Sequence, residues 1–342
     1  MSRIFLDACR CQPTDRTPIW LMRQAGRYMA EYRALREKYT ILEMIKTPEL
    51  AMEVTLQPID AFAVDAAIIF ADILPLLEPM GLELEFIKGE GPVFHNPIDS
   101  ADAVERLKPC EPAVDLGFTM EAIGITRKAL PESIPLIGFS GAPFTLACYA
   151  VEGGSSRTFE KTRALFTEDE ATWHRLMEKI AIAAGEYLRA QIEAGAEAVQ
   201  LFDSWINALT PDEYRRYVAP HSKAVLDAVA DCDVPTIHFS TAGLETALAM
   251  AEAGGDVVGL GPAIDLREAR QRLGGERAIQ GNLEPNLLAD GPVEAIEAGA
   301  ARVLEQAEGR PGHIFNLGHG VLKHTPVDHV RALIDYVHGA SP

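Results

Sequence analysis

The segment Pro18-Ile-Trp-Leu-Met-Arg-Gln-Ala-Gly-Arg-Tyr28 joins a short apolar run to a turn that carries two arginines. An apolar run such as Ile19–Met22 is stable as a strand only when neighbouring elements cover it. Gly26 permits a tight turn, and the guanidiniums of Arg23 and Arg27 are forked donors suited to carboxylates. The segment therefore predicts a covered strand that ends in an anion-binding turn, although two arginines four residues apart also fit a solvated helix face.

Seven further β-rich runs follow along the chain, and most of those in its second half come after Ala-, Glu- and Arg-rich segments of helical character. The predicted strands are Pro18–Met22, Ala66–Phe70, Pro135–Phe139, Ala198–Phe202, Pro235–Phe239, Asp256–Leu260, Ala278–Gly281 and His313–Leu317. Eight strands that alternate with helices predict a single (β/α)8 TIM-type barrel over residues 1–342, with the active site at the carboxyl ends of the strands.

A doubly wound open sheet is the competing fold, and it would require a phosphate-binding loop. The nearest candidate, Gly259–Ile264, lacks the third glycine and carries a proline. Outside the alternation, Leu82–Phe94 is predicted to form a hairpin and Glu152–Arg157 a glycine-serine loop. The acidic segment Asp290–Glu308 is expected to be a solvated helix on the barrel's exterior.

The composition is that of an ordinary globular protein of 342 residues, with 48% hydrophobic and 24% charged residues. Met1–Arg10 lacks the apolar core of a signal peptide, and Asp65 and Asp72 interrupt the most apolar region, Ala61–Leu77. We therefore expect a cytoplasmic protein. The five cysteines form no CxxC pair and no Cys/His cluster of zinc spacing, so reduced thiols and no metal site are expected.

The formal net charge of −19 repels polyanions at long range. Nucleic acids and anionic membrane surfaces are therefore not expected as partners. A small anionic molecule would need a local cationic pocket, which Arg23 and Arg27 could supply.

Polar residues follow the predicted strands at the edge where their carboxyl ends meet. They are Arg23, Asp72, Ser140, Tyr149, Asp203, Ser204, His238, Asp265, Asn282 and His319. The sequence contains no Gly-x-Ser-x-Gly elbow, no Walker loop and no His-Glu-x-x-His, so it gives no support to hydrolase, nucleotide-binding or zincin functions.

Three of these residues are the main candidates beside the arginines, and each has a structural alternative. Asp72 lies in an apolar setting that is costly for a carboxylate without a partner, but aspartate after a strand is also a common helix cap. Tyr149 can present its hydroxyl to the barrel mouth or simply pack in the core. His319 lies between glycines that allow close approach to a ligand, but it is also compatible with a loop histidine without a role.

The chain resembles the uroporphyrinogen decarboxylase family along nearly its whole length. The matching stretches are Pro18–Tyr28, Ala67–Leu74, Gly138–Gly154, Gln200–Trp205, Gly281–Pro285 and Asn316–Gly320, of which the first and last are the most specific. The resemblance implies a cytoplasmic homodimeric barrel that decarboxylates the four acetate side chains of uroporphyrinogen III to give coproporphyrinogen III, in haem biosynthesis, without a cofactor.

The resemblance also implies roles for individual residues. Arg23, Arg27 and His319 would contact substrate carboxylates, and Asp72 would bind the pyrrole N–H groups. Tyr149 and Ser204 match further pocket residues. The proton donor stays open between Tyr149, His319 and water, because arginine is a poor donor with a pKa above about 12.

Some positions depart from the family pattern and indicate a different pocket rim. Ile206-Asn207 replaces alanine-glycine after Ser204-Trp205, Gly261-Pro262 replaces an Asp-Trp pair, and Ala30 follows Met29 where a proline is usual. Two other functions are weighed against decarboxylation. A methyltransferase of the same superfamily would need a zinc-binding His-x-Cys pair, which His238-Phe239-Ser240 lacks, and a tetrapyrrole carrier would not need Asp72.

Overall fold

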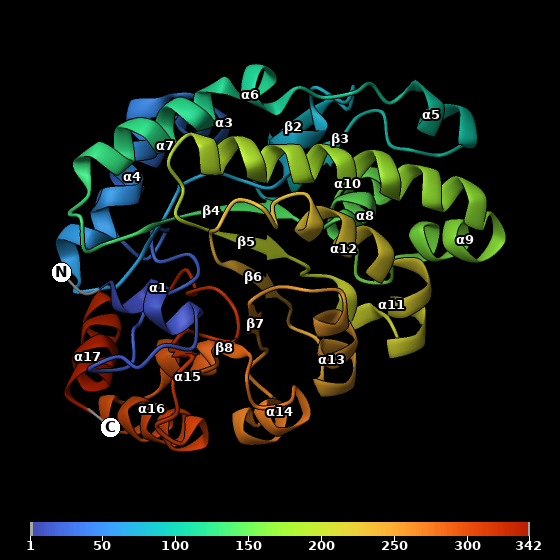
Figure 1. Ribbon diagram of the computed structural model, residues 1–342. Helices are drawn as coiled ribbons and strands as arrows, with labels where there is room; N and C mark the ends of the chain where they lie inside the picture. The colour runs from blue at the N-terminus through green and yellow to red at the C-terminus, as the bar shows by residue number, and fades with distance from the viewer. Residues whose placement is uncertain (1–2, 341–342) are drawn as a thin grey trace.

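The computed structural model describes residues 3–340, which fold around a curled parallel sheet of seven strands surrounded by helices (Figure 1). In sheet order the strands are β1 (Ala67–Ile68), β4 (Leu136–Gly141), β5 (Ala198–Phe202), β6 (Thr236–Phe239), β7 (Val257–Gly259), β8 (Ala278–Gln280) and β9 (His313–Ile314). All neighbours pair in parallel, so the carboxyl ends of the strands share one edge.

The first predicted strand, Pro18–Met22, is not a strand in the structure, and the expectation of eight strands was wrong in this respect. Ile19 forms one isolated parallel bridge with Phe315, just after β9. The N–H of Ile19 donates to the carboxylate of Asp65 (2.8 Å) instead of to a backbone carbonyl. The run keeps two ladder hydrogen bonds on the side of β9, from the N–H of Trp20 to the carbonyl of Phe315 (3.3 Å) and from the N–H of Phe315 to that of Pro18 (2.8 Å). On the other side the side-chain acceptor takes the ladder position, and the pairing does not extend into a strand.

The helices cover the outside of the sheet (Figure 1). Two short 3-10 turns follow β1 and β5 in the chain. The helices before the fourth strand are α1 (Ile4–Cys9), α2 (Ala30–Arg36), α3 (Ile41–Lys46), α4 (Pro48–Ala61), α5 (Ala101–Arg106), α6 (Pro112–Asp115) and α7 (Gly117–Ala129). Those after it are α8 (Pro143–Glu152), α9 (Glu160–Glu168), α10 (Glu170–Glu193), α11 (Pro211–Tyr217), α12 (Ala219–Asp227), α13 (Leu244–Glu252), α14 (Leu266–Arg272), α15 (Pro285–Asp290), α16 (Val293–Ala307) and α17 (Val327–Gly339). The turns are η1 (Leu74–Leu77) and η2 (Ile206–Ala208).

Helix α10 illustrates how the sequence places these helices. Trp173, Met177, Ile180 and Ala184 recur at helical spacing and are buried, so one face of the helix packs against the core. Asp169 caps its first turn by accepting the N–H of Thr172 at 3.1 Å, as in Asp-initiated helices generally.

The irregular segments follow the predictions closely. The hairpin expected at Leu82–Phe94 is confirmed as β2 (Leu84–Ile87) paired antiparallel with β3 (Gly91–Phe94). Gly89 connects them with a φ of 92°, a conformation that favours glycine. The helix expected over Asp290–Glu308 is present as α16, which packs against α17, α14 and α15.

All five cysteines lie within the described residues, and all are free, as expected. Within residues 3–340, the helices include none that combines the length and the apolar character needed to cross a membrane.

Candidate active site

The turn that carries Arg23 is fixed to the loop that carries His319. The N–H of Met22 donates to Asn316 Oδ1 (3.0 Å), and the N–H of Val321 donates to the carbonyl of Met22 (2.9 Å). Arg23 has a φ of 61°, in the left-handed region. Its side chain lies so close to Gly320 that a Cβ there would be 2.5 Å from Arg23 Cδ, and only glycine leaves room for it.

Gln24, which was not among the predicted site residues, also supports this turn. It is buried, accepts the N–H of Leu21 (3.1 Å) and donates to the carbonyl of Ala66 at the start of β1 (3.1 Å). Its own carbonyl accepts the hydroxyl of Tyr28. A glutamine between two exposed arginines in an otherwise apolar run is the signal that could have revealed this anchoring residue.

Asp72 follows β1 and is only partly exposed. Its Oδ1 accepts the N–H of Leu74 (2.9 Å), the first residue of η1, although the N-cap position of this turn is Ile73 and not Asp72. Burial raises the pKa of Asp72, whereas the Leu74 N–H and the charge of Arg23 act to lower it. The carboxylate is therefore placed within the field of Arg23 while it also holds a turn.

Tyr149 lies near the end of α8, with its ring packed against Trp205 at a centroid distance of 5.8 Å. Burial raises the pKa of Tyr149 to about 12, and the charge of Asp72 contributes in the same direction. The phenol is thus neutral at physiological pH, and its hydroxyl is close enough to Asp72 to be affected by that charge. The core packing weighed from the sequence is present, and the presentation of the hydroxyl to a substrate stays a prediction.

His319 is exposed, and its Nδ1 accepts the N–H of Gly320 (2.7 Å). In the neutral ring the proton must then be on Nε2, which makes this nitrogen a donor. Partial desolvation of the ring by the protein around it, followed by the charge of Arg23, lowers the pKa of His319. At neutral pH the residue therefore presents an uncharged N–H.

Arg27 and Ser204 lie at the edges of this group. Arg27 is exposed and acts electrostatically on Tyr32, whose pKa is raised mainly by burial and also by Asp72. Ser204 lies just after β5, where its carbonyl accepts the hydroxyl of Thr241 (3.4 Å). The charge of Arg23 thus acts on Asp72, Tyr149 and His319, and that of Asp72 acts on Tyr149. Arg27 is related to this group through Tyr32, and Ser204 precedes Trp205, which packs on Tyr149.

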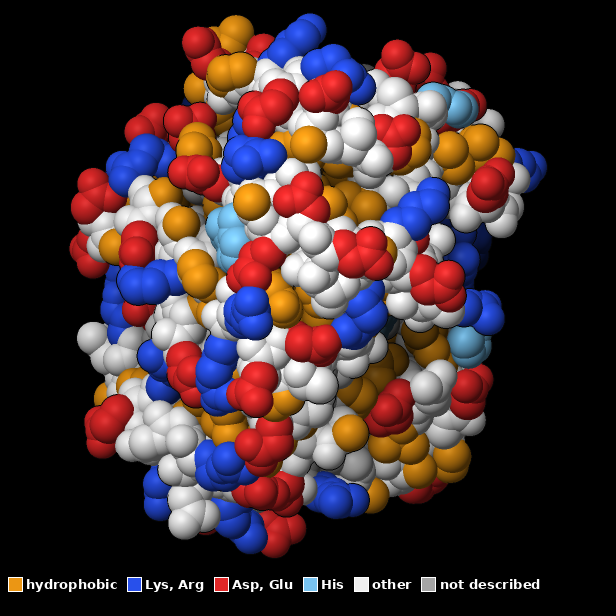
Figure 2. Space-filling view, turned by 90° about the vertical axis from the view of Figure 1, so that its right-hand side faces the viewer, with side chains coloured by type: hydrophobic (Ala, Val, Ile, Leu, Met, Phe, Trp, Pro, Cys, Tyr) orange, Lys and Arg blue, Asp and Glu red, His pale blue; other side chains and the backbone are white. Residues whose placement is uncertain are grey.

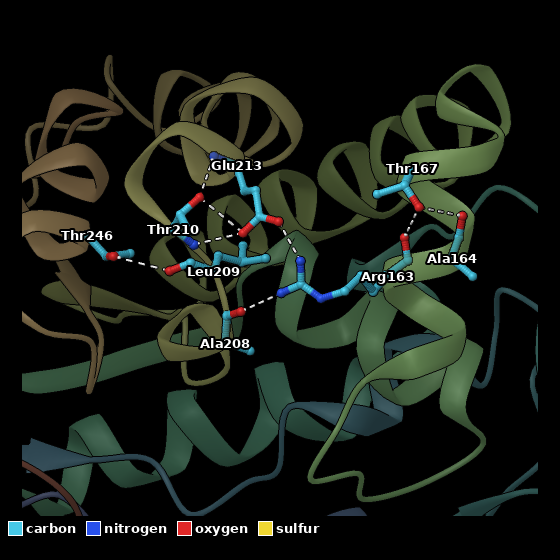
Figure 3. Close-up of polar contacts among 8 residues, drawn as sticks. All are labelled: Arg163, Ala164, Thr167, Ala208, Leu209, Thr210, Glu213 and Thr246. Atoms are coloured by element: carbon cyan, nitrogen blue, oxygen red, sulfur yellow. Dashed lines mark hydrogen bonds and ion pairs between the residues drawn. The ribbon is translucent and has the colours of Figure 1, made fainter.

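The loop after β5 is held from two sides, as Figure 3 shows. Arg163 of α9 forms an ion pair with Glu213 and donates to the carbonyl of Ala208 (2.6 Å). On the other side, the hydroxyl of Thr246 donates to the carbonyl of Leu209 (3.3 Å). These contacts fix the loop that positions Ser204 and Trp205.

A buried polar cluster lies behind Ser204. Asp203 is fully buried and accepts the hydroxyls of Thr145 and Tyr214, each at 3.4 Å. The Nε2 of His238 is 3.6 Å from Asp203 Oδ2, and neither ring nitrogen of this buried histidine has a hydrogen-bond partner among the described residues.

Two other polar residues at the predicted strand ends are structural. Asp265 caps α14 by accepting the N–H of Glu268 (3.0 Å). Asn282 is buried and donates to the carbonyls of Gly261 and Ile264, both at 2.7 Å. It thereby fixes one of the segments that depart from the family pattern, and the amide has no capacity left to donate to a ligand.

The carboxyl ends of the strands point to the side of the molecule where α8, α9 and α11 lie in Figure 1. Figure 2 views this side and shows acidic and basic side chains interspersed around a recess with largely hydrophobic walls. A recess of this kind suits a ligand with an apolar body and charged substituents.

The family model described as "Uroporphyrinogen decarboxylase (URO-D)" matches residues 2–340. The chain belongs to the uroporphyrinogen decarboxylase family. Curated uroporphyrinogen decarboxylases from Chloroflexus aurantiacus and Sorangium cellulosum are each 54% identical to it, over 337 and 334 residues. The alignments cover 97% and 98% of this chain and 94% and 95% of those proteins.

Two solved structures share the fold of this uroporphyrinogen decarboxylase family member at low sequence identity. A methyltransferase from Methanosarcina mazei has a TM-score of 0.76 at 21% identity, with 97% of this chain and 96% of that one covered. A B12-independent methionine synthase from Shewanella sp. has a TM-score of 0.59 at 11% identity, with 95% and 94% covered. At these identities the likeness concerns the fold alone.

Proposed function

We propose that the protein removes carbon dioxide from the four acetate side chains of uroporphyrinogen III and releases coproporphyrinogen III, as a carboxy-lyase of tetrapyrrole biosynthesis. Family membership over nearly the whole chain supports this activity. The observation that carries the assignment within the structure is the group formed by Arg23, Asp72, Tyr149 and His319 at the carboxyl edge of one sheet.

The chemistry uses the substrate as its own electron sink. Protonation of the ring carbon beside the one that bears the acetate gives a cationic iminium conjugated with the acetate-bearing carbon. The electrons of the breaking C–C bond then form a double bond from that carbon to the methylene group and neutralise the cation as carbon dioxide leaves. A second proton then attaches at the methylene carbon, which becomes a methyl group, while the proton first added is lost and the pyrrole is restored. No redox or group-transfer cofactor is needed, and we propose that none is used.

Asp72 is the proposed centre of this site. An ionised carboxylate accepts hydrogen bonds on two oxygens, so the inward N–H groups of a flexible tetrapyrrole can converge on it while it stabilises the cation. Arg23 and Arg27 would bind carboxylates at the periphery as charged donors, and His319 would do so through Nε2. Tyr149 and Ser204 would line the pocket, and the protons would come from Tyr149, His319 or water.

The proposal treats residues 1–342 as one barrel domain in which Pro18–Met22 occupies the place of an eighth strand. The N–H of Asp65 donates to the carbonyl of Ile19 (2.8 Å) on one side, and Ile19 bridges to Phe315 on the other, which supports this view. We further propose a cytoplasmic homodimer that uses neither a metal nor a nucleic-acid or membrane partner. Sedimentation equilibrium at several concentrations would test the dimer.

Anaerobic incubation with uroporphyrinogen III, followed by mass spectrometry of the product, tests the activity. We expect four successive losses of carbon dioxide that end at coproporphyrinogen. Binding without any change of mass would overturn the proposal and favour the carrier function, for which the arginines suffice and Asp72 is not needed.

A further inference from the structure

A cavity lies at the end of the sheet opposite to the candidate active site. Its volume is about 420 Å³. Its walls come from α14, from the turn that leads into β8, and from the loop that leads into β9. The lining residues are Arg267, Arg270, Gln271, Gly274, Gly275, Glu308 and Arg310. Because β8 begins at Ala278 and β9 at His313, the cavity faces the amino ends of these strands.

Arg270 is the unusual member of this lining. Arg270 is only 3% exposed, and its Nε, Nη1 and Nη2 atoms have no hydrogen-bond partner among residues 3–340. Burial lowers the pKa of Arg270. A buried guanidinium that lacks both hydrogen bonds and a paired carboxylate is costly, so this position requires a compensating anion.

The rim of the cavity adds further positive charge. Arg267 and Arg310 share a single carboxylate, since their Nε atoms lie 3.1 and 3.4 Å from the two oxygens of Glu308. The three guanidiniums and one carboxylate of the lining leave a local charge of +2, on a chain whose formal net charge is −19. The net negative charge of the chain repels anions at long range, so an anion would be held in the cavity by direct pairing with these guanidiniums.

We propose that this cavity binds a phosphate group, either as free phosphate or as a phosphate monoester, with Arg270 as its buried counter-charge and Arg267 and Arg310 at its rim. Guanidinium forks match the geometry of phosphate oxygens, and a phosphate dianion balances the local charge of +2, whereas a single carboxylate would balance only half of it. The site does not depend on the proposed decarboxylation, because it faces the other end of the sheet.

Isothermal titration calorimetry with inorganic phosphate, at an ionic strength held constant with chloride, tests the site. Arg270→Met should weaken phosphate binding by about tenfold or more, because the variant removes the buried charge and keeps an apolar side chain of similar length. Arg272→Met is the matched control on the same helix, since Arg272 pairs with Glu245 at the surface. Its affinity for phosphate should equal that of the wild type.

Thermal melts in phosphate supply the second measurement. Phosphate stabilises proteins in general by exclusion from their surfaces, so the informative quantity is the rise of the midpoint in the wild type beyond that in Arg270→Met. Should Arg270→Met not fold, Arg310→Gln at the exposed rim replaces it, with an expected loss of affinity of about threefold or more.

Titration with glycerol 3-phosphate distinguishes a phosphate monoester from free phosphate as the ligand. Tighter binding than that of inorganic phosphate would identify a phosphorylated metabolite as the ligand. Equal or weaker binding would identify free phosphate. The absence of binding heat with either compound, or an equal rise of the midpoint in wild type and Arg270→Met, would overturn the proposal.

Discussion

Arg23 sets the electrostatic character of the candidate active site. Its charge opposes the effect of burial on the pKa of Asp72, and it adds to the lowering of the pKa of His319. One guanidinium thus favours an ionised aspartate and a neutral histidine at the same time. In the proposed function, a neutral His319 would donate a hydrogen bond from Nε2 to a substrate carboxylate, and Arg23 and Arg27 would be the charged contacts.

Replacement of Arg23 or Arg27 by alanine should weaken capture of the anionic substrate. We expect kcat/KM to fall by about tenfold or more in each case, and further for Arg23, because its charge also acts on Asp72. Steady-state decarboxylation measures the effect, and Arg302→Ala on the exposed face of α16 is the control. Values within about twofold of wild type for both variants would contradict the cationic-pocket assignment.

Asp72→Asn should abolish most turnover while the fold is kept. The amide retains an oxygen that can accept the N–H of Leu74, but it loses the charge proposed to stabilise the cationic intermediate and brings two N–H donors. Loss of one preorganised group of this kind costs about 10²–10³ in rate. Turnover near the wild-type level would refute the central role of Asp72.

The difference in thermal stability between Asp72→Asn and the wild type should depend on pH with a definite sign, because the carboxyl titrates and the amide does not. Because burial raises the folded-state pKa of Asp72 above its ordinary value of 3.8, the stabilising effect of the protonated form is complete below that pH and is lost as the pH rises through the folded-state pKa. At pH 7 the variant should therefore melt at or above the wild-type temperature, and a melt lowered enough to unfold it would identify Asp72 as mainly a capping residue.

The sequence could indicate the reactive side chains but not those that hold them. Asp72, Tyr149 and His319 follow apolar runs, and this local pattern is visible without a structure. The roles of Gln24 and Asn316 depend on distant partners: Asn316 accepts the N–H of Met22 across 294 residues. No local pattern records such a contact, because a buried amide is satisfied by whatever the fold brings to it.

At the scale of elements, the failure of Pro18–Met22 to form a strand has the same kind of cause. Asp65 is held by both guanidinium nitrogens of Arg16 (2.7 and 2.6 Å), and its Oδ2 also lies 3.1 Å from the ring of His338 in α17. This carboxylate occupies the place where a neighbouring strand would present a carbonyl to Ile19. The apolar pattern predicted burial of the run correctly but could not predict which group would accept its hydrogen bonds.

The contacts of α9 and α13 with the loop after β5 lead to a prediction about positioning. Arg163→Met removes the ion pair with Glu213 and the hydrogen bond to Ala208, so the loop that carries Ser204 and Trp205 should lose its fixed geometry. We expect KM to rise about threefold to tenfold with a smaller change in kcat, since the loop is proposed to position substrate rather than to react with it.

Arg216→Met is the matched control for Arg163→Met, because Arg216 pairs with Glu170 at the surface of α11. The KM of Arg163→Lys should lie between those of Arg163→Met and the wild type, since a lysine can keep the charge pair but not both hydrogen bonds. An effect on thermal stability without any effect on KM would show that Arg163 supports the fold alone.

At the scale of the whole molecule, the architecture leaves the chemistry open. The methyltransferase from Methanosarcina mazei matches nearly the whole chain with a TM-score of 0.76, although only 21% of the residues are identical. The fold is therefore shared by chains whose sequences differ at most positions, and function has to be argued from the side chains of the site.

Zinc dependence would distinguish a decarboxylase site from the site of a zinc-dependent methyltransferase. A zinc-activated methyl transfer needs thiolate and imidazole ligands in tetrahedral arrangement, but Phe239-Ser240 follows His238, and no cysteine occurs after Cys232. The imidazole of His238 lies instead in a buried cluster beside Asp203, behind the proposed substrate site.

We therefore expect dialysis against a strong chelator to leave decarboxylation unchanged, as measured by the rate of product formation before and after treatment. Stoichiometric zinc in the purified protein, together with activity that the chelator removes and added zinc restores, would assign the chain to the metal-dependent branch instead.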